Sequence, residues 1–248
     1  MLMAQLSVLD RVGCKLKGTF REMRGAQIVS NDGIRLIVDR DQLKDDAIIR
    51  ALLFDRHERT EAALVKYCLR PGDRVLELGS GVGFITMLCA RICGAANVVT
   101  LEGNPTMHAL LVRNLAMNRY AVDARQSVVS LDGGPVTFHL SESLVSSSML
   151  DRGDAAAETV PSTSFRDLLA EIEPTVVIMD IEGSEIDLLG TCPMPSVRAI
   201  GVETHPQIVG EDAIAAMDRR LAALGFQVDE RFPTASKRCL YVREPRKN

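Results

Sequence analysis

Apolar residues follow two patterns along the chain, short runs that are mostly apolar and longer stretches with a helical period. Each short run is long enough for a buried strand. The runs are residues 75–78, 98–101, 175–179 and 197–202. Apolar side chains also recur every three or four positions, which predicts helices, over residues 84–93, 105–118, 165–172, 185–189 and 212–224. Strands that alternate with helices indicate a parallel sheet covered on both faces.

The two ends of the chain add antiparallel pieces. β-prone residues 27–29 and 34–38 flank the turn sequence Asn31-Asp32-Gly33, which predicts a hairpin, and helical segments follow near 45–54 and 58–69. Residues 226–231 and 238–242 have the pattern of a terminal antiparallel pair. The predicted fold is therefore α/β, a doubly wound, Rossmann-like, seven-stranded and mostly parallel sheet with a terminal antiparallel hairpin. An N-terminal β-hairpin and helical extension over 1–57 precedes the main domain over 58–248.

Composition narrows the classes of partner. The 248 residues are 46% hydrophobic and 25% charged, as in an ordinary globular domain, and the formal charge of −4 gives no basic footprint for nucleic acid. The first ten residues are too short and too soon interrupted by Asp10 for a signal peptide, and no apolar run is long enough to span a membrane. Six scattered cysteines without zinc spacing indicate free thiols. We expect a cytoplasmic protein with no membrane or nucleic-acid partner.

The most informative stretch is residues 73–84, Asp-Arg-Val-Leu-Glu-Leu-Gly-Ser-Gly-Val-Gly-Phe. It predicts a buried strand, a glycine turn at Gly79, Gly81 and Gly83, and a helix that begins at Phe84. The spacing is Gly-x-Gly-x-Gly rather than the Gly-x-Gly-x-x-Gly that holds a pyrophosphate. Glu77 would repel a pyrophosphate but suits a ligand with an ammonium group or hydroxyls, such as the amino-acid part of S-adenosylmethionine.

Acidic residues follow four of the predicted strands: Glu77, Glu102, Asp180 and Glu203. Ligands of open α/β sheets bind beyond the carboxyl ends of the strands, so these acids predict an electronegative rim that suits a cationic sulfonium ligand. Glu102 follows Gly83 by 19 residues, the interval at which an acid binds ribose hydroxyls in both NAD and S-adenosylmethionine enzymes. Ser127, near the start of the predicted third strand, lies where an adenine would be read.

Residues 180–185, Asp-Ile-Glu-Gly-Ser-Glu, would lie at the centre of that rim. Asp180 would be nearest the reacting group, Gly183 allows close backbone approach, and Glu185 begins the next helix. The Asn/Asp-Pro-Pro-aromatic turn of many amino-nitrogen methyltransferases is absent. A carboxylate-rich turn better suits a hydroxyl acceptor, with Asp180, Glu182 or His205 as candidate bases. Asp180 and Glu182 could supply two oxygen ligands to a metal ion, but nothing in the spacing requires one, and no metal ligand is assigned.

With these pieces placed, the chain resembles the FkbM family of S-adenosylmethionine-dependent methyltransferases. The resemblance runs from about Glu58 to His205. Four segments carry it: residues 71–83, residues 98–118 with Glu102, Asn104 and Asn114, residues 132–138 leading to 146–149, and residues 180–185. The last two are more specific to the family than the first two. Where family members often have Gly-Ala-Asn-x-Gly, this chain has the general methyltransferase form Gly79-Ser80-Gly81-Val82-Gly83.

The resemblance implies a class I methyltransferase fold and O-methylation of a hydroxyl on a small molecule or sugar. The candidate catalytic residues are Asp180, Glu182 and His205, and the candidate S-adenosylmethionine contacts are Glu77, Gly79, Ser80, Gly81, Gly83, Phe84, Glu102, Gly103, Asn104 and Ser127. Two alternatives stay open: a catalytically silent cofactor-binding interaction module and an NAD-dependent oxidoreductase. The expected partner is a small-molecule or carbohydrate acceptor, whose pocket residues 1–57 could cap. The sequence leaves the acceptor and the oligomeric state undetermined, and it predicts a loop over residues 141–157.

Overall fold

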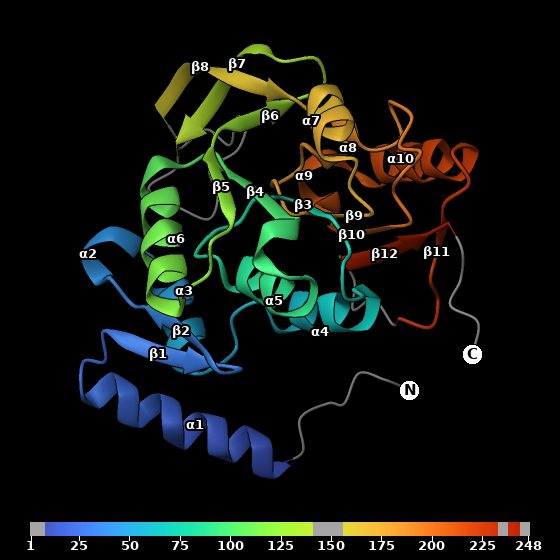
Figure 1. Ribbon diagram of the computed structural model, residues 1–248. Helices are drawn as coiled ribbons and strands as arrows, with labels where there is room; N and C mark the ends of the chain where they lie inside the picture. Colours follow the sequence, from blue (N-terminus) through green and yellow to red (C-terminus); the bar gives the residue numbers. More distant parts are fainter. Residues whose placement is uncertain (1–7, 141–155, 233–237, 244–248) are drawn as a thin grey trace.

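A seven-stranded sheet crosses the centre of the molecule (Figure 1) in the order β11-β12-β10-β9-β3-β4-β5. The computed structural model describes residues 8–140, 156–232 and 238–243. The strands are β3 (Val75–Leu78), β4 (Val98–Glu102), β5 (Asp123–Gln126), β9 (Val176–Met179), β10 (Ala199–Glu203), β11 (Gln227–Val228) and β12 (Arg238–Val242). Strand β12 inserts between β10 and β11 and pairs antiparallel with both, whereas the other strand pairs of this sheet are parallel. The predicted fold class is confirmed, with β11 shorter than predicted.

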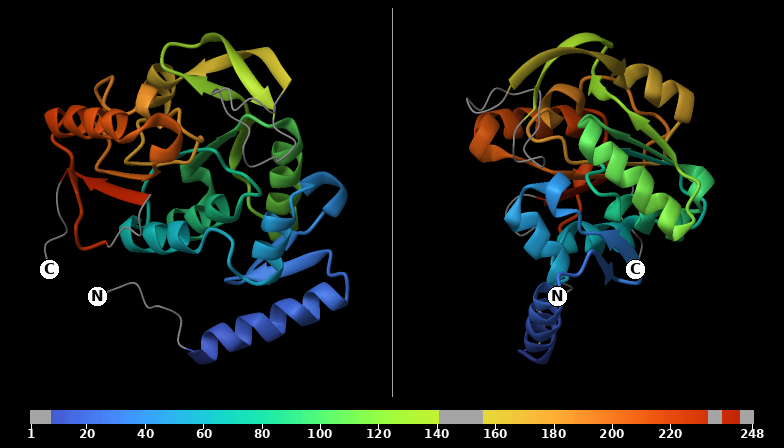
Figure 2. Two further views of the ribbon diagram at one scale, coloured as in Figure 1. Left: turned by 180° about the vertical axis from the view of Figure 1, so that it is seen from behind. Right: turned by 90° about the vertical axis from the view of Figure 1, so that its left-hand side faces the viewer.

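Helices cover both faces of this sheet (Figure 2). Alternate strand residues point to opposite faces, so Val75 and Val176 pack on one side while Leu76 and Val177 pack on the other. The first face is covered by α4 (Arg59–Cys68), α5 (Phe84–Cys93) and α6 (Pro105–Asn118). The second is covered by α7 (Phe165–Ile172), α8 (Glu185–Leu188) and α10 (Glu211–Ala223). The two apolar layers hold the strand ends in fixed register.

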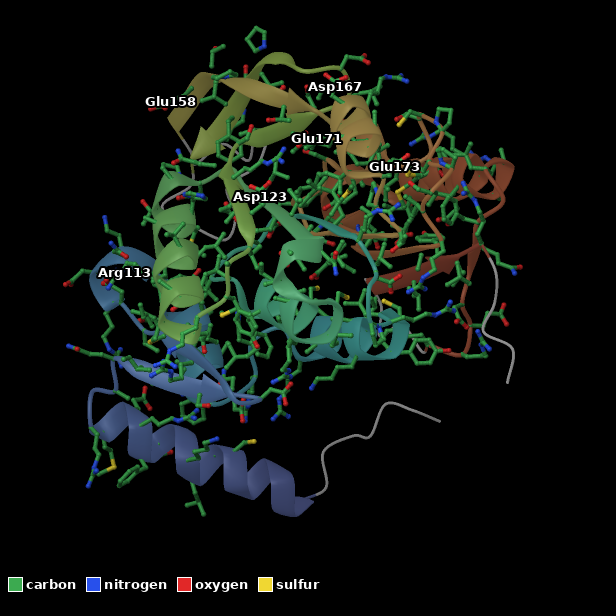
Figure 3. All side chains as sticks on the ribbon, viewed as in Figure 1. Arg113, Asp123, Glu158, Asp167, Glu171 and Glu173 are labelled. Atoms are coloured by element: carbon green, nitrogen blue, oxygen red, sulfur yellow. The ribbon has the colours of Figure 1, made fainter. Side chains whose placement is uncertain are left out.

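The third strand of the sheet is not where the sequence predicted it. It is β5, Asp123–Gln126, and Ser127 follows the strand instead of lying at its start. β5 is the edge strand and carries polar, partly exposed side chains, so it lacks the apolar run by which the other strands were found. Arg125 of β5 pairs with Asp123 and with Glu171 of α7, both at 2.7 Å; Figure 3 labels these two acids.

A separate three-stranded sheet leads away from the end of β5. It consists of β6 (Val128–Ser130), β7 (Gly134–Leu140) and β8 (Ala156–Ser164), in the order β6-β8-β7. Sequence analysis missed β8, because Pro161 lies in its middle and proline is unusual inside a central strand. Residues 156 and 157 therefore begin a strand, contrary to the predicted loop, and residues 141–155 lie outside the described residues.

The N-terminal extension packs on the same core as the sheet. It contains α1 (Val8–Met23), β1 (Ile28–Asn31), β2 (Ile34–Ile37), α2 (Arg40–Leu43) and α3 (Asp46–Leu53). The predicted hairpin is confirmed: Asp32 and Gly33 both have positive φ, 50° and 78°, as a tight two-residue turn requires. Leu36 and Leu52 are fully buried in one cluster with α5 and α6. The division at residue 57 remains a prediction, and none of residues 8–57 lines either of the two clefts described below.

Asn114 of α6 connects the hairpin to the glycine turn. Its Oδ1 accepts a hydrogen bond from the Ile37 amide at 2.9 Å, and its Nδ2 donates to the Val82 carbonyl at 2.9 Å. Asn118 exchanges a second pair of bonds with Arg35, accepting from its amide and donating to its carbonyl. Asn114 therefore provides a hydrogen-bond acceptor to the free edge of β2 and also holds the glycine turn at Val82.

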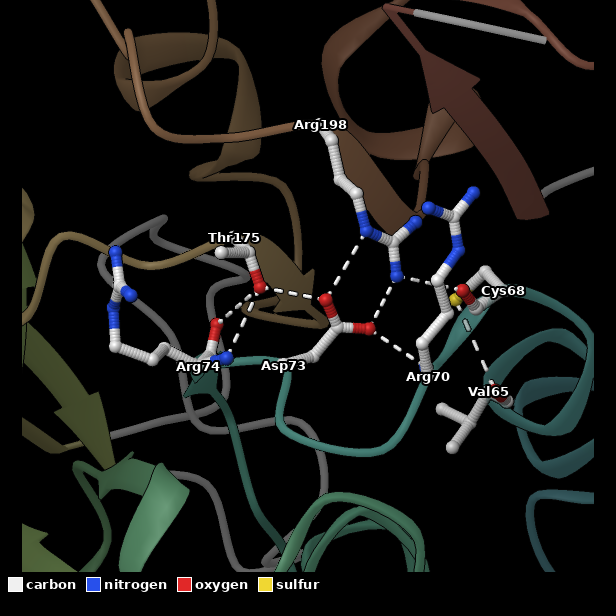
Figure 4. Close-up of polar contacts among 7 residues, drawn as sticks. All are labelled: Val65, Cys68, Arg70, Asp73, Arg74, Thr175 and Arg198. Atoms are coloured by element: carbon white, nitrogen blue, oxygen red, sulfur yellow. Dashed lines mark hydrogen bonds and ion pairs between the residues drawn. The ribbon is translucent and has the colours of Figure 1, made fainter. Parts of the chain in front are cut away.

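A network of hydrogen bonds connects three strands at the amino edge of the sheet, where the parallel strands begin (Figure 4). The Asp73 carboxylate accepts hydrogen bonds from Thr175 Oγ1 at 2.8 Å, from the Arg70 amide at 2.7 Å and from the Arg198 guanidinium. Arg198 also donates to the Cys68 carbonyl at 2.9 Å. Since these residues precede β3, β9 and β10, the network sets the three strands in register.

No helix in the described part of the chain combines the length and the apolar character that crossing a membrane requires. Five cysteines with described side chains, Cys14, Cys68, Cys89, Cys93 and Cys192, are free thiols, as expected.

Candidate active site

Two adjoining clefts lie at the carboxyl edge of the sheet. The larger, an open cleft of about 770 Å³, lies over the ends of β3 and β4 and reaches the three-stranded sheet. The smaller, about 460 Å³, lies over β9 and β10 beneath α4. Glu58, Gly79 and Asp180 line both. The two clefts therefore meet where a ligand in one could react with a ligand in the other.

The glycine turn forms as predicted, and its glycines are required by space as well as by backbone angle. Gly79, Gly81 and Gly83 have φ values of 85°, 52° and 85°. A Cβ at Gly79 would come within 1.8 Å of the Asp180 carbonyl oxygen, and one at Gly83 within 2.4 Å of Leu111. Gly79 and Gly81 line the larger cleft. The side chain of Ser80, in contrast, is buried and bonded to Thr100 Oγ1 at 2.6 Å, so only its backbone faces the turn.

Glu77 lies below the rim rather than on it. Strand β3 ends at Leu78, and the Glu77 side chain is only 1% exposed. Its Oε2 accepts hydrogen bonds from Thr86 Oγ1 and Thr100 Oγ1, each at 2.6 Å. Burial raises the pKa of Glu77 to about 7, although the threonine bonds oppose the shift. It lines the smaller cleft, and the rim itself is formed by Glu102, Asp180 and Glu203.

Glu102 ends β4 beside the glycine turn. Its two carboxylate oxygens accept backbone hydrogen bonds from Gly81 at 2.9 Å and from Asn104 at 2.8 Å. Burial raises its pKa, against the effect of those backbone donors. Gly103 lines the cleft beside it, and Asn104 caps α6 by accepting from the Thr106 and Met107 amides. The carboxylate keeps further lone pairs for hydroxyl groups in the cleft.

The far end of the larger cleft is apolar. Ser127 lines it, as predicted, although its hydroxyl donates to the Val128 carbonyl and contacts Thr163 Oγ1 at 2.7 Å. Sequence analysis missed the apolar wall, which consists of Leu101, Met107, Val128, Val129 and Phe138. Phe138 belongs to β7 of the three-stranded sheet, so its place in the cleft depends on how that sheet packs and could not be predicted from the sequence. Phe84 lines neither cleft; it is buried at the start of α5, near the His57 ring.

Glu185 shapes the turn after β9. It begins α8, as predicted, and its carboxylate accepts from the Ile181 and Gly183 amides, both at 2.8 Å. Glu182 adopts a positive φ of 59°, which non-glycine residues seldom do. These bonds hold Asp180 and Glu182 toward the larger cleft, which both line. Burial, followed by repulsion from Glu203, Glu182, Glu185 and Glu58, raises the pKa of Asp180 well above its usual value.

His205 joins this acidic group from the end of β10. Its Nε2 lies 3.7 Å from Asp180 Oδ1 and 3.5 Å from Glu182 Oε2, and its Nδ1 lies 3.4 Å from Glu185 Oε1. Burial alone would lower the pKa of His205, but Glu185, Glu182 and Glu203 outweigh it and raise the pKa. The structure therefore brings the three predicted catalytic residues together.

Glu58 is the residue at the junction that sequence analysis did not single out. It precedes α4 with a positive φ of 47°, and His57 Nε2 lies 3.2 Å from its carboxylate. Burial would lower the pKa of His57, but Glu58 raises it. Glu58 could not be predicted as a cleft residue, because the segment before α4 that contains it has no recognisable motif.

A comparison with protein-family models finds one match, to "Protein-L-isoaspartate(D-aspartate) O-methyltransferase", over residues 57–136. This third of the chain contains the glycine turn, Glu102 and Asn104. No curated protein matches the chain.

Among solved structures, similar folds occur in methyltransferases. A structure titled M. jannaschii TYW2 in complex with AdoMet is 12% identical, with a TM-score of 0.47, over 88% of this chain and 86% of that one. The precorrin-6y C5,15-methyltransferase of Geobacter metallireducens is 12% identical, with a TM-score of 0.44, over 70% and 74%. Likeness at this level adds no evidence on function. Strand order, glycine turn and family match together support an enzyme that transfers methyl groups from S-adenosylmethionine.

Proposed function

We propose that the protein transfers the methyl group of S-adenosylmethionine to a hydroxyl oxygen of a small molecule or sugar. The observation that carries this proposal is the meeting of two clefts at Gly79 and Asp180. One cleft has the features of a nucleoside site and the other is acidic. A methyl group at their junction would be open to attack by an acceptor in the smaller cleft.

The larger cleft suits the donor along its whole length. The glycine turn leaves room for the ligand, and Glu102 offers carboxylate oxygens to ribose hydroxyls. Leu101, Met107, Val128 and Phe138 provide an apolar wall for an adenine. Toward Asp180 the wall becomes acidic, and this end favours the positive sulfonium.

The acidic junction also selects the acceptor. Asp180, Glu182 and Glu203 would repel an acceptor that reacts through a carboxylate, such as the isoaspartate named in the family match. A neutral hydroxyl fits better. Its oxygen would attack the methyl carbon while the carbon–sulfur bond breaks, leaving the electron pair on the sulfur of S-adenosylhomocysteine. The hydroxyl proton would pass to Asp180, Glu182 or His205, a step that contributes roughly 10²–10⁴-fold to such rates.

The placement in the FkbM family and the cytoplasmic location are further parts of the proposal. The more specific segments of the family resemblance are residues 132–138, which lead to 146–149, and residues 180–185; residues 146–149 lie outside the described residues. The family's usual acceptors, sugars and polyketide-like products, are neutral and rich in hydroxyl groups. Such an acceptor agrees with a net charge of −4 and with the acidic second cleft.

Calorimetry with S-adenosylmethionine tests the donor site. Glu102→Gln replaces one acceptor oxygen with a donor group, so we expect a dissociation constant about 10–100-fold higher. Glu173→Gln, an exposed change far from the cleft in sequence and sheet, is the matched control and should bind as the native protein does. Binding of NAD instead of S-adenosylmethionine would refute the donor assignment.

A labelled-donor assay with a panel of hydroxylated acceptors tests the transfer itself. We expect turnover to fall in Asp180→Ala and Glu182→Ala. Full turnover in both variants would remove these residues from catalysis. Donor binding with no transfer to any hydroxyl, but transfer to an amine, would overturn the proposed acceptor class.

A further inference from the structure

The acids at the ends of β9 and β10 form a cluster with His205. Asp180, Glu203 and His205 each offer one ligand atom, and these atoms all lie within 4.8 Å of one another. Two oxygen or nitrogen atoms bound to one metal ion at about 2.0–2.3 Å each can lie at most roughly 4.6 Å apart. Small side-chain rotations would therefore bring all three atoms to one ion.

His205 provides a second, independent observation. Its side chain is 6% exposed, and Nε2 points toward Asp180 and Glu182 at 3.7 and 3.5 Å, which is too long for a hydrogen bond. Asp180 Oδ1, which faces Nε2 at 3.7 Å, is buried without a hydrogen-bond partner among the described residues. A buried imidazole and a buried carboxylate oxygen thus face a common space without bonding to each other. A cation in that space would satisfy both.

Glu185 orients the histidine for this role. It is almost fully buried and held by the Ile181 and Gly183 amides, and its Oε1 lies 3.4 Å from Nδ1. A proton on Nδ1 would face this carboxylate and leave the lone pair of Nε2 directed at the cluster. Metal-binding histidines commonly have such a carboxylate behind them.

We propose that Asp180, Glu203 and His205 bind a divalent first-row transition-metal ion. One imidazole nitrogen with two carboxylate oxygens suits such ions better than Ca²⁺ or Mg²⁺, which favour oxygen ligands alone. Glu203 and His205 thus take the place of Glu182, which the sequence suggested as a ligand beside Asp180. Three protein ligands leave positions open for further oxygens.

The consequence for methyl transfer rests on the proposed function. Asp180 lines both clefts and Glu203 lines the smaller, so an acceptor hydroxyl in that cleft could reach an open position on the ion. Binding there would lower the pKa of the hydroxyl and make its oxygen a better nucleophile. Glu182, outside the three ligands, would remain to take the proton.

Mn²⁺ is the probe for the test, added to the full chain without S-adenosylmethionine. Electron paramagnetic resonance of free Mn²⁺ should show one ion bound per chain. Spin-echo modulation should show a nitrogen coupling that His205→Gln removes. Asp180→Asn and Glu203→Gln should each weaken binding by at least about tenfold, whereas Glu173→Gln should not change it. No stoichiometric binding, or a nitrogen coupling that persists in His205→Gln, would overturn the site.

Calorimetry with S-adenosylmethionine keeps this result separate from the proposed function. Glu203 and His205 do not line the larger cleft, so their variants should bind the donor if they are folded. Donor binding without Mn²⁺ binding in the native protein would refute only the metal site. Mn²⁺ binding with its nitrogen coupling, but no donor binding, would refute only the proposed function.

Discussion

Gly79 is the residue where backbone angle and space both exclude a side chain. Its φ of 85° is costly for any other residue, and a Cβ would overlap the Asp180 carbonyl at 1.8 Å. Gly72 is a matched control, with a φ of 80° and no atom within 4 Å of an added Cβ. Gly72→Ala therefore measures the free-energy cost of the positive φ alone, without the steric overlap that Gly79→Ala adds.

We expect Gly72→Ala to lower the free energy of unfolding by about 1–2 kcal/mol, and Gly79→Ala by clearly more. Gly79→Ala should also weaken S-adenosylmethionine binding at least about tenfold, because the turn must move away from the end of β9. Chemical denaturation and calorimetry measure the two effects. Equal effects of the two substitutions would show that the overlap with the Asp180 carbonyl, at the end of β9, does not add to the cost at Gly79.

The buried carboxyl of Glu77 predicts a particular dependence of stability on pH. Its folded pKa is about 7, because burial outweighs the threonine hydrogen bonds, with Glu58 and Glu102 adding repulsion. The unfolded value is near 4.5, so the folded state binds the extra proton between the two values. This contribution to stability is fully present below about pH 4.5 and is lost as the pH rises through 7.

Glu77→Gln should remove that loss, which is on the order of 3 kcal/mol. Both threonine hydroxyls donate to the same oxygen, Oε2, so a single amide oxygen can accept both bonds. The thiol of Cys89, which lies near Glu77, stays protonated, because burial and Glu77 raise its pKa well above the usual value. Urea denaturation of the native protein and of Glu77→Gln at pH 5 and pH 8 measures this loss of stability. An equal change in the free energy of unfolding between the two pH values in both proteins would contradict the raised pKa of Glu77.

At the scale of elements, the Asp73 network decides how β3, β9 and β10 are held. Removing Arg198 as Arg198→Met would leave a buried carboxylate with fewer donors, and we expect a loss of about 3 kcal/mol. Arg74→Met is the control: within the described residues that exposed guanidinium donates only to the Ile172 and Glu173 carbonyls, so its loss should cost less than about 1 kcal/mol.

The stabilisation by the Asp73 network is lost at low pH. Burial would raise the pKa of Asp73, but hydrogen bonds from Arg198, Thr175 and Arg70 outweigh it and lower the pKa below 3.8. The stabilisation is therefore present above the unfolded value near 3.8 and is lost as the pH falls through the folded one. The stability gap between the native protein and Arg198→Met should narrow in urea titrations below pH 4, and a constant gap would show that Asp73 is not the partner that matters.

At the scale of the whole molecule, the buried central strands and the two antiparallel hairpins were predictable, whereas three other elements were not. Strands β3, β4, β9 and β10 are mostly apolar because both of their faces are covered. Edge strand β5, proline-containing β8 and helix α1 have no such constraint, and the sequence did not reveal them.

The site divides in the same way. Gly79, Glu102 and Asp180 stand at strand ends, where position along the chain sets position in space, so their place could be predicted. Glu58 and Phe138 reach the larger cleft from elements whose path depends on tertiary packing. Helix α6 shows the limit, since its apolar repeat was predicted but the hydrogen-bond partners of its buried Asn114 were not.

Those partners carry a consequence for how the molecule moves. Asn114 holds the Ile37 amide with one end of its side chain and the Val82 carbonyl with the other. Any molecule that steadies residues 79–83 must also reduce the opening of this amide, because both bonds break when the asparagine leaves. Deuterium uptake at Ile37 would then report occupancy of a cleft to which the hairpin contributes no atom.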